Sequence, residues 1–236
     1  MVERKDKIID YYFRYYDSAG ILENLDRLVV TLSNIAISAQ GEEPSEEMCV
    51  RVRGKLKHCE NLVVVESQGI AVGFGIFVLI PTANDGIILY EDGKMVSQGF
   101  QGQGIGADIT KQAKEKLSHH CFVMRTQNPA EMTSVTKEFP NLKPYDRNDP
   151  IHRRLLLAIA ERLSETEETD FERGVFRPEK RRGRIGDYQI RLSDPRVQEV
   201  EDIFSKRELD REYGERLYFI AVPGGQEETE NQKRLK

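Results

Sequence analysis

Three apolar segments that follow one another, with short polar turns between them, limit the folds open to this chain. They read NLVVVE at 61–66, IAVGFGIFVLI at 70–80 and IILYEDGKMVS at 87–97, and they are separated by SQG and by PTANDG. Short runs of β-branched and aromatic residues bounded by glycine, proline and asparagine are typical of strands joined by tight turns. The sequence therefore predicts an antiparallel meander of three strands.

Strand and helix patterns also precede the meander. The segment KIIDYYFRYY at 7–16 is rich in β-forming residues and predicts a first strand, with a short helix as the alternative. Apolar residues then recur every three or four positions over 18–37, which predicts an amphipathic helix with Ser18 as its N-cap. A second helix is expected over 45–57.

After the meander the period changes again. A helix is predicted from about 106 to 118, a short apolar strand over CFVMRT at 121–126, and a further helix over 131–139. The resulting order of strand, two helices, three strands, helix, strand and helix predicts a single α/β unit.

The C-terminal part adds helices and one strand. Helices are predicted over IHRRLLLAIAERLSE at 151–165 and over DPRVQEVEDIFSKREL at 194–209, where Asp194 is the expected cap and a proline holds the first helical position. LYFIAV at 217–222 predicts a final strand, and the polar end that follows is expected to be disordered.

A basic segment lies between those two helices. Residues 165–172 are mostly acidic, and the sequence from Arg173 to Arg191 then turns basic. Three interpretations stay open: a solvated loop balanced by the acidic run, a contact with phosphates of a cofactor, or a contact with RNA.

Composition excludes some classes of function. The formal net charge of -5 gives no general attraction to nucleic acid or to an anionic membrane. Three cysteines without metal-ligand spacing predict free thiols in a reducing compartment, and no metal site is expected. The N-terminus lacks an apolar signal core and the longest apolar run is too short for a membrane span, so the expected location is the cytoplasm.

The stretch VSQGFQGQGIGADITKQAKEKL at 96–117 places a glycine-rich turn directly before a helix. Glycines at 102, 104 and 106 allow positive φ angles and close approach of a ligand to the backbone. The helix start adds free N–H donors and partial positive charge, which suit a phosphate or pyrophosphate. The pattern lacks the GK[ST] of a Walker loop and the GxGxxG of a dinucleotide fold, and a turn without a ligand is the remaining alternative.

This stretch resembles the acetyl-coenzyme A loop of the GNAT superfamily of N-acetyltransferases, whose signature is Q/R-x-x-G-x-G/A. Gln101, Gly104 and Gly106 fill the signature, while Val96 and Phe100 stand at the matching upstream positions. QGIAVGF at 68–74 and RTQNPAEM at 125–132 resemble the family's third-strand turn and fifth-strand end. The likeness covers roughly 7–145.

The resemblance implies an α/β fold with a mixed, mostly antiparallel central sheet and helices on both faces. We expect one GNAT-like domain over 1–222, with a core at 7–145 and a C-terminal extension at 146–222 that inserts helices before a final strand. Residues 223–236 are the expected disordered tail.

The resemblance also implies how acetyl-coenzyme A would be held. Main-chain groups of Lys94, Met95 and Val96 would bind the pantetheine arm and the thioester carbonyl, and Asn128 would hydrogen-bond the cofactor. The turn would receive the pyrophosphate, through Gln101, Gly102, Gln103, Gly104, Ile105, Gly106 and Ala107.

The chain departs from the family at its usual catalytic positions. Val135 stands where a general-acid tyrosine is common, and Val123 where some members carry a glutamate. Tyr145 is a candidate replacement acid, with a packed loop anchor as the alternative. Glu91 and Asp92 are candidate bases, although EDG is also a good turn.

The predicted function is an N-acetyltransferase that transfers an acetyl or other short acyl group from coenzyme A to an amine of a small molecule or protein. Two other functions stay open: a non-catalytic coenzyme A-binding module, and an acyltransferase directed to RNA through the basic segment. The identity of the acceptor amine and the oligomeric state are not predicted.

Overall fold

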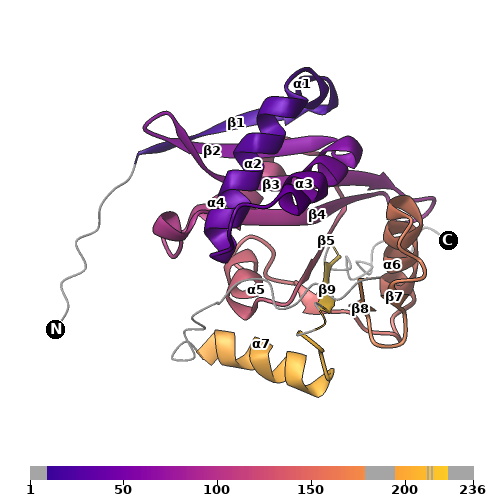
Figure 1. The fold of residues 1–236 in the computed structure, drawn as a ribbon. Helices are drawn as coiled ribbons and strands as arrows, with labels where there is room; N and C mark the ends of the chain where they lie inside the picture. The colour runs from indigo at the N-terminus through magenta and orange to yellow at the C-terminus, as the bar shows by residue number, and fades with distance from the viewer. Residues whose placement is uncertain (1–9, 179–194, 212, 214, 223–236) are drawn as a thin grey trace.

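The computed structural model describes residues 10–178, 195–211, 213 and 215–222 (Figure 1). Its strands are β1 (Tyr11–Asp17), β2 (Asn61–Ser67), β3 (Ile70–Pro81), β4 (Ile87–Val96), β5 (Cys121–Thr126), β6 (Lys143–Pro144), β7 (Thr169–Asp170), β8 (Val175–Phe176) and β9 (Arg216–Ala221). Its helices are α1 (Ser18–Glu23), α2 (Leu25–Gln40), α3 (Glu46–His58), α4 (Ile105–Lys116), α5 (Pro129–Val135), α6 (Pro150–Leu163) and α7 (Pro195–Lys206), with a short 3-10 turn η1 (Gln98–Phe100).

The described strands form one sheet in the order β1-β2-β3-β4-β5-β9-β8-β7, and β6 also pairs with β9. Among the described pairs, only β4 and β5 run parallel. This arrangement confirms the predicted α/β class with a mixed, mostly antiparallel sheet. The meander of β2, β3 and β4 and the first strand β1 are confirmed as well.

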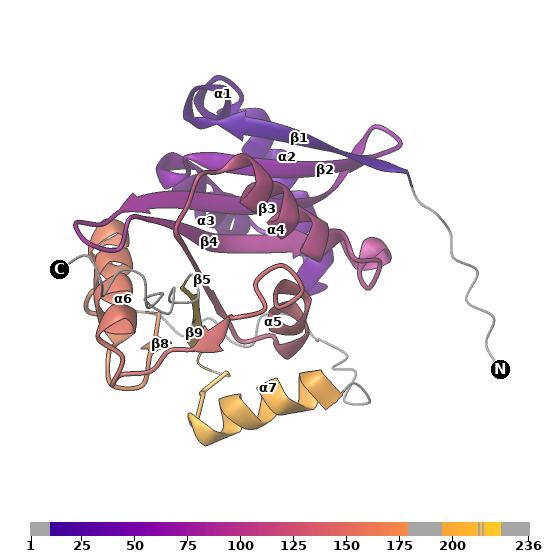
Figure 2. The same cartoon turned by 180° about the vertical axis from the view of Figure 1, so that it is seen from behind.

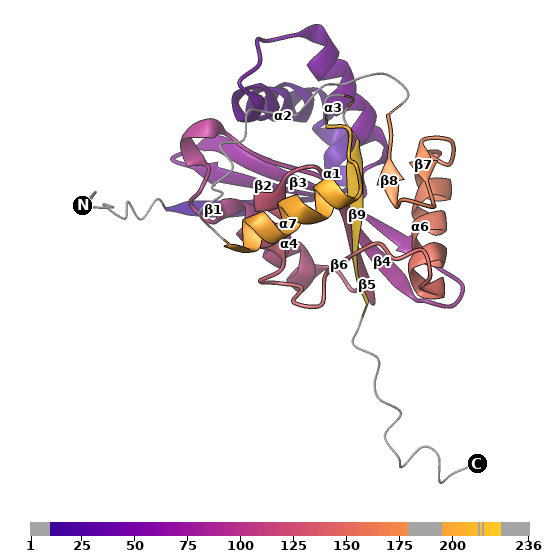
Figure 3. The same ribbon diagram turned by 90° about the horizontal axis from the view of Figure 1, so that it is seen from below.

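Alternation along the strands separates two faces of the sheet. In β2, Leu62 and Val64 pack beneath α2 and α3, whereas Val63 and Val65 pack against the cluster that contains α4, α5 and α7. Figure 3 shows α2 and α3 on one side of the strands and α4 and α7 on the other, and Figure 2 shows α4 lying across the sheet. Helices on both faces were predicted and are present.

The first helix prediction is partly wrong. The segment expected as one helix over 18–37 breaks at Asn24, whose side-chain amide donates to the carbonyl of Gly20 at 2.9 Å. The helix cap is Asp17 rather than Ser18, because the Asp17 carboxylate accepts from the Gly20 N–H at 2.8 Å. Short polar side chains compete with helical bonding in this way, and two helices result.

The C-terminal extension joins the sheet instead of standing apart from it. β9 pairs antiparallel with β5 over Leu217 to Ala221, and β8 pairs with β9. The short strands β6, β7 and β8 were not predicted, since two-residue strands leave no period in a sequence. Asp194, most of the basic segment from residue 179 onward and the tail at 223–236 lie outside the described residues.

Gly174 allows the C-terminal extension to pack closely against Tyr145. Its φ is +67°, and a Cβ there would lie 2.3 Å from Cδ1 of the fully buried Tyr145 ring. We expect Gly174→Ala to lower the free energy of unfolding by about 3 kcal/mol, because backbone strain and a clash with a buried ring add together. Thermal and denaturant unfolding measure this.

Gly41→Ala is the matched control for that substitution. Gly41 has φ +66° and open space around its missing Cβ, so only the strain of roughly 1 kcal/mol is expected. Equal losses of stability in the two variants would contradict the packing of Tyr145 against the extension.

Candidate functional site

β4 and β5 part at the centre of the sheet. Their parallel pairing ends with Glu91 opposite Met124, although β4 continues to Val96. On the other side of β4, Glu91 faces Phe77 and Gly93 faces Ile76, so Asp92 is the extra residue of a bulge. No described strand pairs with the β5 side of β4 beyond Glu91, and an extended ligand can add to such an edge.

The glycine turn follows this edge. Gly104 caps α4 with a φ of +89°, and its missing Cβ would have no neighbour within 4 Å. The first N–H groups bonded within the helix belong to Ala107 and Asp108, both to the Gly104 carbonyl. The N–H groups of Ile105 and Gly106 therefore precede the first hydrogen bonds within the helix, and an anion at the helix start can accept hydrogen bonds from them. This backbone fits a pyrophosphate.

The glutamines of the turn have structural partners. Gln101 donates through Nε2 to the carbonyl of Val96 at 2.9 Å and to that of Ala39 at 3.2 Å, which ties the turn to the end of β4 and to α2. Gln103 donates to the Gly99 carbonyl at 3.2 Å. Both side chains hold the turn in shape.

A pocket that is open to solvent lies beside the unpaired edge of β4. One wall is apolar and comes from α2, α3, β3 and β4, through Ala36, Met48, Val52, Phe74, Ile76 and Met95. The other wall is polar and carries most of the charged side chains described next.

Glu91 and Lys94 neutralise one another at the base of the pocket. Their side chains are 2% and 4% exposed, and Lys94 Nζ lies 3.0 Å from Glu91 Oε1. Thr110 of α4 donates to Glu91 at 2.8 Å and accepts from Lys94 at 2.7 Å. Glu91, a base candidate from the sequence, is therefore held as the partner of a lysine.

Asp92 is surrounded by cations. Lys55 Nζ donates to Asp92 Oδ2 at 2.6 Å and to the Asp92 carbonyl at 2.8 Å, and Arg125 lies 3.4 Å from Oδ1. Burial alone would raise the pKa of Asp92, but Lys55 and Arg125 outweigh it and hold the pKa below its usual value. A carboxylate with a lowered pKa is a weak proton acceptor.

The pKa of Lys55 is also lowered, but here burial is the cause and the charged partner opposes it. Burial lowers the pKa of its ammonium group, and Asp92 opposes this effect only in part. Its Nζ lies 3.8 Å from the position that a Cβ at Gly93 would take, so the ammonium group stands over the first residue after the bulge. Lys55 thus lines the pocket where β4 leaves β5.

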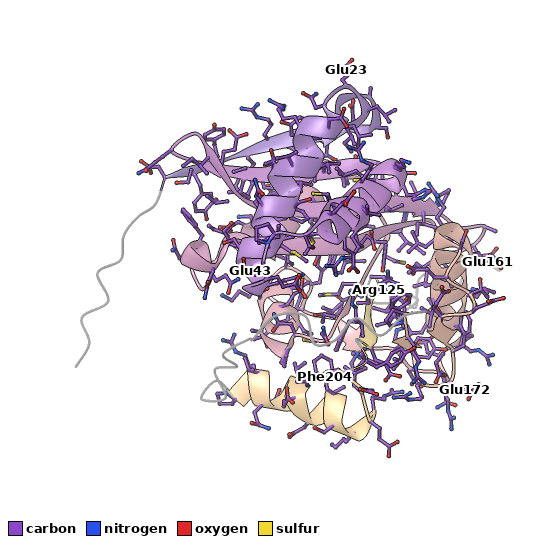
Figure 4. All side chains as sticks on the ribbon, in the orientation of Figure 1. Glu23, Glu43, Arg125, Glu161, Glu172 and Phe204 are labelled. Atoms are coloured by element: carbon purple, nitrogen blue, oxygen red, sulfur yellow. The ribbon has the colours of Figure 1, made fainter. Side chains whose placement is uncertain are left out.

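Arg125 connects this site to the extension. Its guanidinium is 4% exposed, binds both carboxylate oxygens of Glu165, and donates to the Tyr218 hydroxyl at 3.2 Å. It also stacks 3.8 Å from the ring centroid of Phe176. Figure 4 shows Arg125 inside the molecule, whereas Glu161 and Glu172 project from its surface.

Glu131 completes the polar wall, and no sequence pattern singled it out. It lies in the first turn of α5, accepts from Thr126 Oγ1 at 2.6 Å, and stands 4.0 Å from Lys94 Nζ. Burial raises the pKa of Glu131, and Lys94 offsets this only partly. Its position three residues after Asn128 is typical of a helix-capping acid, which conceals its place in the pocket.

Other residues predicted from the sequence lie elsewhere. Tyr145 is fully buried against the extension, does not line the pocket, and donates its hydroxyl to the Phe171 carbonyl at 2.8 Å. Asn128 caps α5 by accepting from the Ala130 N–H at 3.0 Å. Arg173 donates to main-chain carbonyls of Arg207 and Glu208, both at 2.8 Å, so the start of the basic segment packs on the fold.

The described residues contain no group of three His, Cys, Asp or Glu side chains placed to hold a metal ion. None of the helices in that part of the chain combines the length and apolar character needed to cross a bilayer.

Comparisons with known proteins give matches in structure only. No family model matches the chain, and no curated protein matches its sequence. The fold resembles a putative acetyltransferase of the GNAT family from Desulfovibrio desulfuricans, at 10% identity and a TM-score of 0.44 over 58% of this chain and 87% of that one.

Two other solved structures were matched. An IAA acetyltransferase from Bacillus cereus has 10% identity and a TM-score of 0.43 over 91% of this chain and all of that one. A putative acetyltransferase from Salmonella typhimurium with acetyl-CoA has 15% identity and a TM-score of 0.38 over 58% and 81%. All three TM-scores lie below 0.5.

Proposed function

We propose that this chain is an acyltransferase that transfers an acetyl or other short acyl group from a coenzyme A thioester to an amine. The observation that carries the proposal is that the unpaired edge of β4 and the glycine turn before α4 follow one another along the chain, and that the edge borders one pocket. The main chain of Lys94 to Val96 would pair with the pantetheine arm, and Gly102 to Ala107 would receive the pyrophosphate.

The coenzyme supplies an activated acyl group, and the chain's part is to position the amine and to move two protons. Glu131 takes the proton that the attacking amine loses, because its raised pKa makes it a stronger base than Asp92, whose pKa is lowered. Lys55 donates a proton to the departing sulfur, because its lowered pKa makes it a better donor than an ordinary lysine.

Free thiol release tests this function. The protein is incubated with acetyl-coenzyme A and a panel of primary amines, and thiol is measured against time. Release that depends on the amine supports the enzyme. Binding of acetyl-coenzyme A without thiol release in the presence of any amine would favour the non-catalytic module. That alternative stays open because the buried Val123 and Val135 stand at the positions of the two usual catalytic side chains.

Two substitutions of Lys55 distinguish a role as proton donor from a role as a positive charge that only stabilises the site. We expect Lys55→Met and Lys55→Arg both to lower kcat about 10- to 100-fold, since neither side chain can give up a proton near neutral pH. In the wild type, the rate should fall on the alkaline side at a pH below the usual lysine pKa, as Lys55 loses its proton.

Lys57→Met, on an exposed position of the same helix, is the control and should keep full activity. Full activity in Lys55→Arg would show that the positive charge beside Asp92 is enough, and proton donation by Lys55 would be refuted.

A further inference from the structure

Gln127 is a buried amide without a partner. It follows β5, is 4% exposed and lines the pocket, yet neither Nε2 nor Oε1 has a hydrogen-bond partner among the described residues. A buried amide left unpaired is costly, and native proteins rarely keep one without a reason. The donor Nε2 and the acceptor Oε1 of Gln127 are therefore both available to a ligand in this pocket.

Two further unpaired atoms lie on the side of the pocket that α2 and α3 form. Gln40 Oε1 of α2 and Arg51 Nε of α3 are also buried with no partner in the described part of the chain, and both residues line the pocket. α4 packs on the other face of the sheet. An occupant that satisfies these atoms therefore lies toward α2 and α3, where the pocket wall is apolar through Met48 and Val52.

We propose that Gln127 recognises an amide group of the acceptor, and that the acceptor is an amine joined to a primary amide and an apolar side group, as in an amino-acid amide. A primary amide has an N–H and a C=O on the same edge of its plane, so it can satisfy Oε1 and Nε2 of Gln127 at once, whereas the N–H and C=O of a trans peptide amide point in opposite directions. A carboxylate would leave Oε1 unpaired, and a simple alkylamine would leave both atoms unpaired. This inference rests on the acyltransferase function proposed above.

Three probes that share one amine and one side chain test the inference. Leucinamide carries the amide, leucine carries a carboxylate in its place, and 3-methylbutylamine carries neither. For the wild type we expect kcat/KM for leucinamide to exceed that for each of the other two by at least about tenfold, since unmade bonds to buried groups reduce affinity. In Gln127→Leu the preference should disappear, through a loss with leucinamide and little change with 3-methylbutylamine.

Stability gives a second readout that does not depend on activity. Because neither amide atom is bonded within the described protein, Gln127→Leu should melt at the same temperature as the wild type or higher. A marked fall in Tm would mean that the amide serves the fold, and the inference would be overturned.

The same assays distinguish the other sources of failure. A rise in KM for acetyl-coenzyme A in Gln127→Leu, equal with all acceptors, would assign the amide to the pantetheine arm of the donor and overturn the inference. Equal use of the three probes, or use of none by a protein that binds acetyl-coenzyme A, would also overturn it. A folded protein that binds no acetyl-coenzyme A would instead refute the acyltransferase function.

Discussion

Gly104→Glu should abolish the binding of acetyl-coenzyme A while leaving the chain folded. A glutamate at this position adds bulk and negative charge at the helix start, where the N–H groups of Ile105 and Gly106 are free to bind an anion. The surrounding space is open, so the fold should tolerate the side chain at the cost of backbone strain. We expect affinity to fall at least about 100-fold in calorimetric titration, since phosphate binding is lost and like charges repel.

Gly69→Glu is a matched control for strain, bulk and charge. Gly69 lies in the turn between β2 and β3 with φ +79°, and a Cβ there would have no neighbour within 4 Å, which is close to the φ of +89° and the open space at Gly104. This variant should bind acetyl-coenzyme A like the wild type. Equal affinity of the two variants for acetyl-coenzyme A would show that the glycine turn is not part of the binding site.

Glu131→Gln should lower kcat about 100- to 1,000-fold, because it keeps the shape of the side chain and removes the proton acceptor. The affinity for acetyl-coenzyme A should change little, since the glycine turn and the edge of β4 are left intact. Steady-state kinetics and calorimetry together measure the separation of kcat from donor binding.

The pH profile shows whether Glu131 acts as the base. Burial raises the pKa of Glu131 above the ordinary glutamate pKa of about 4.3. As the pH falls through this raised pKa the carboxylate becomes protonated, and the rate of the wild type should fall over the same pH range. Glu131→Gln should lack this acid limb. Glu115→Gln, on the exposed side of α4, should keep both rate and profile, and an unchanged acid limb in Glu131→Gln would assign it to another group.

The parts of the fold that depend on local pattern could be predicted from the sequence. The meander and α4 follow from the spacing of apolar residues, and the glycine turn follows from glycines, which permit the positive φ angles that other residues rarely adopt. The break at Asn24 could not be predicted, because it depends on a side-chain bond that competes with a helix of good period.

The charged site could be predicted only in part, for a different physical reason. Asp92 was a candidate, but its partners Lys55, Arg125 and, through Arg125, Glu165 come from α3, β5 and the chain after α6. These contacts exist only once the sheet is assembled, and no spacing in the sequence encodes them. Glu131 was missed because a helix-start glutamate has an ordinary structural explanation.

Hydrogen exchange of the wild type with and without acetyl-coenzyme A tests the proposed donor site most directly. If the coenzyme pairs with the free edge of β4 and caps α4, amides in 93–96 and 104–107 will exchange more slowly in its presence, while those of β1 and the turn at Gly69 will not change. Slower exchange confined to other segments, or no change at saturating acetyl-coenzyme A, would contradict the binding of an acyl donor between the edge of β4 and the glycine turn.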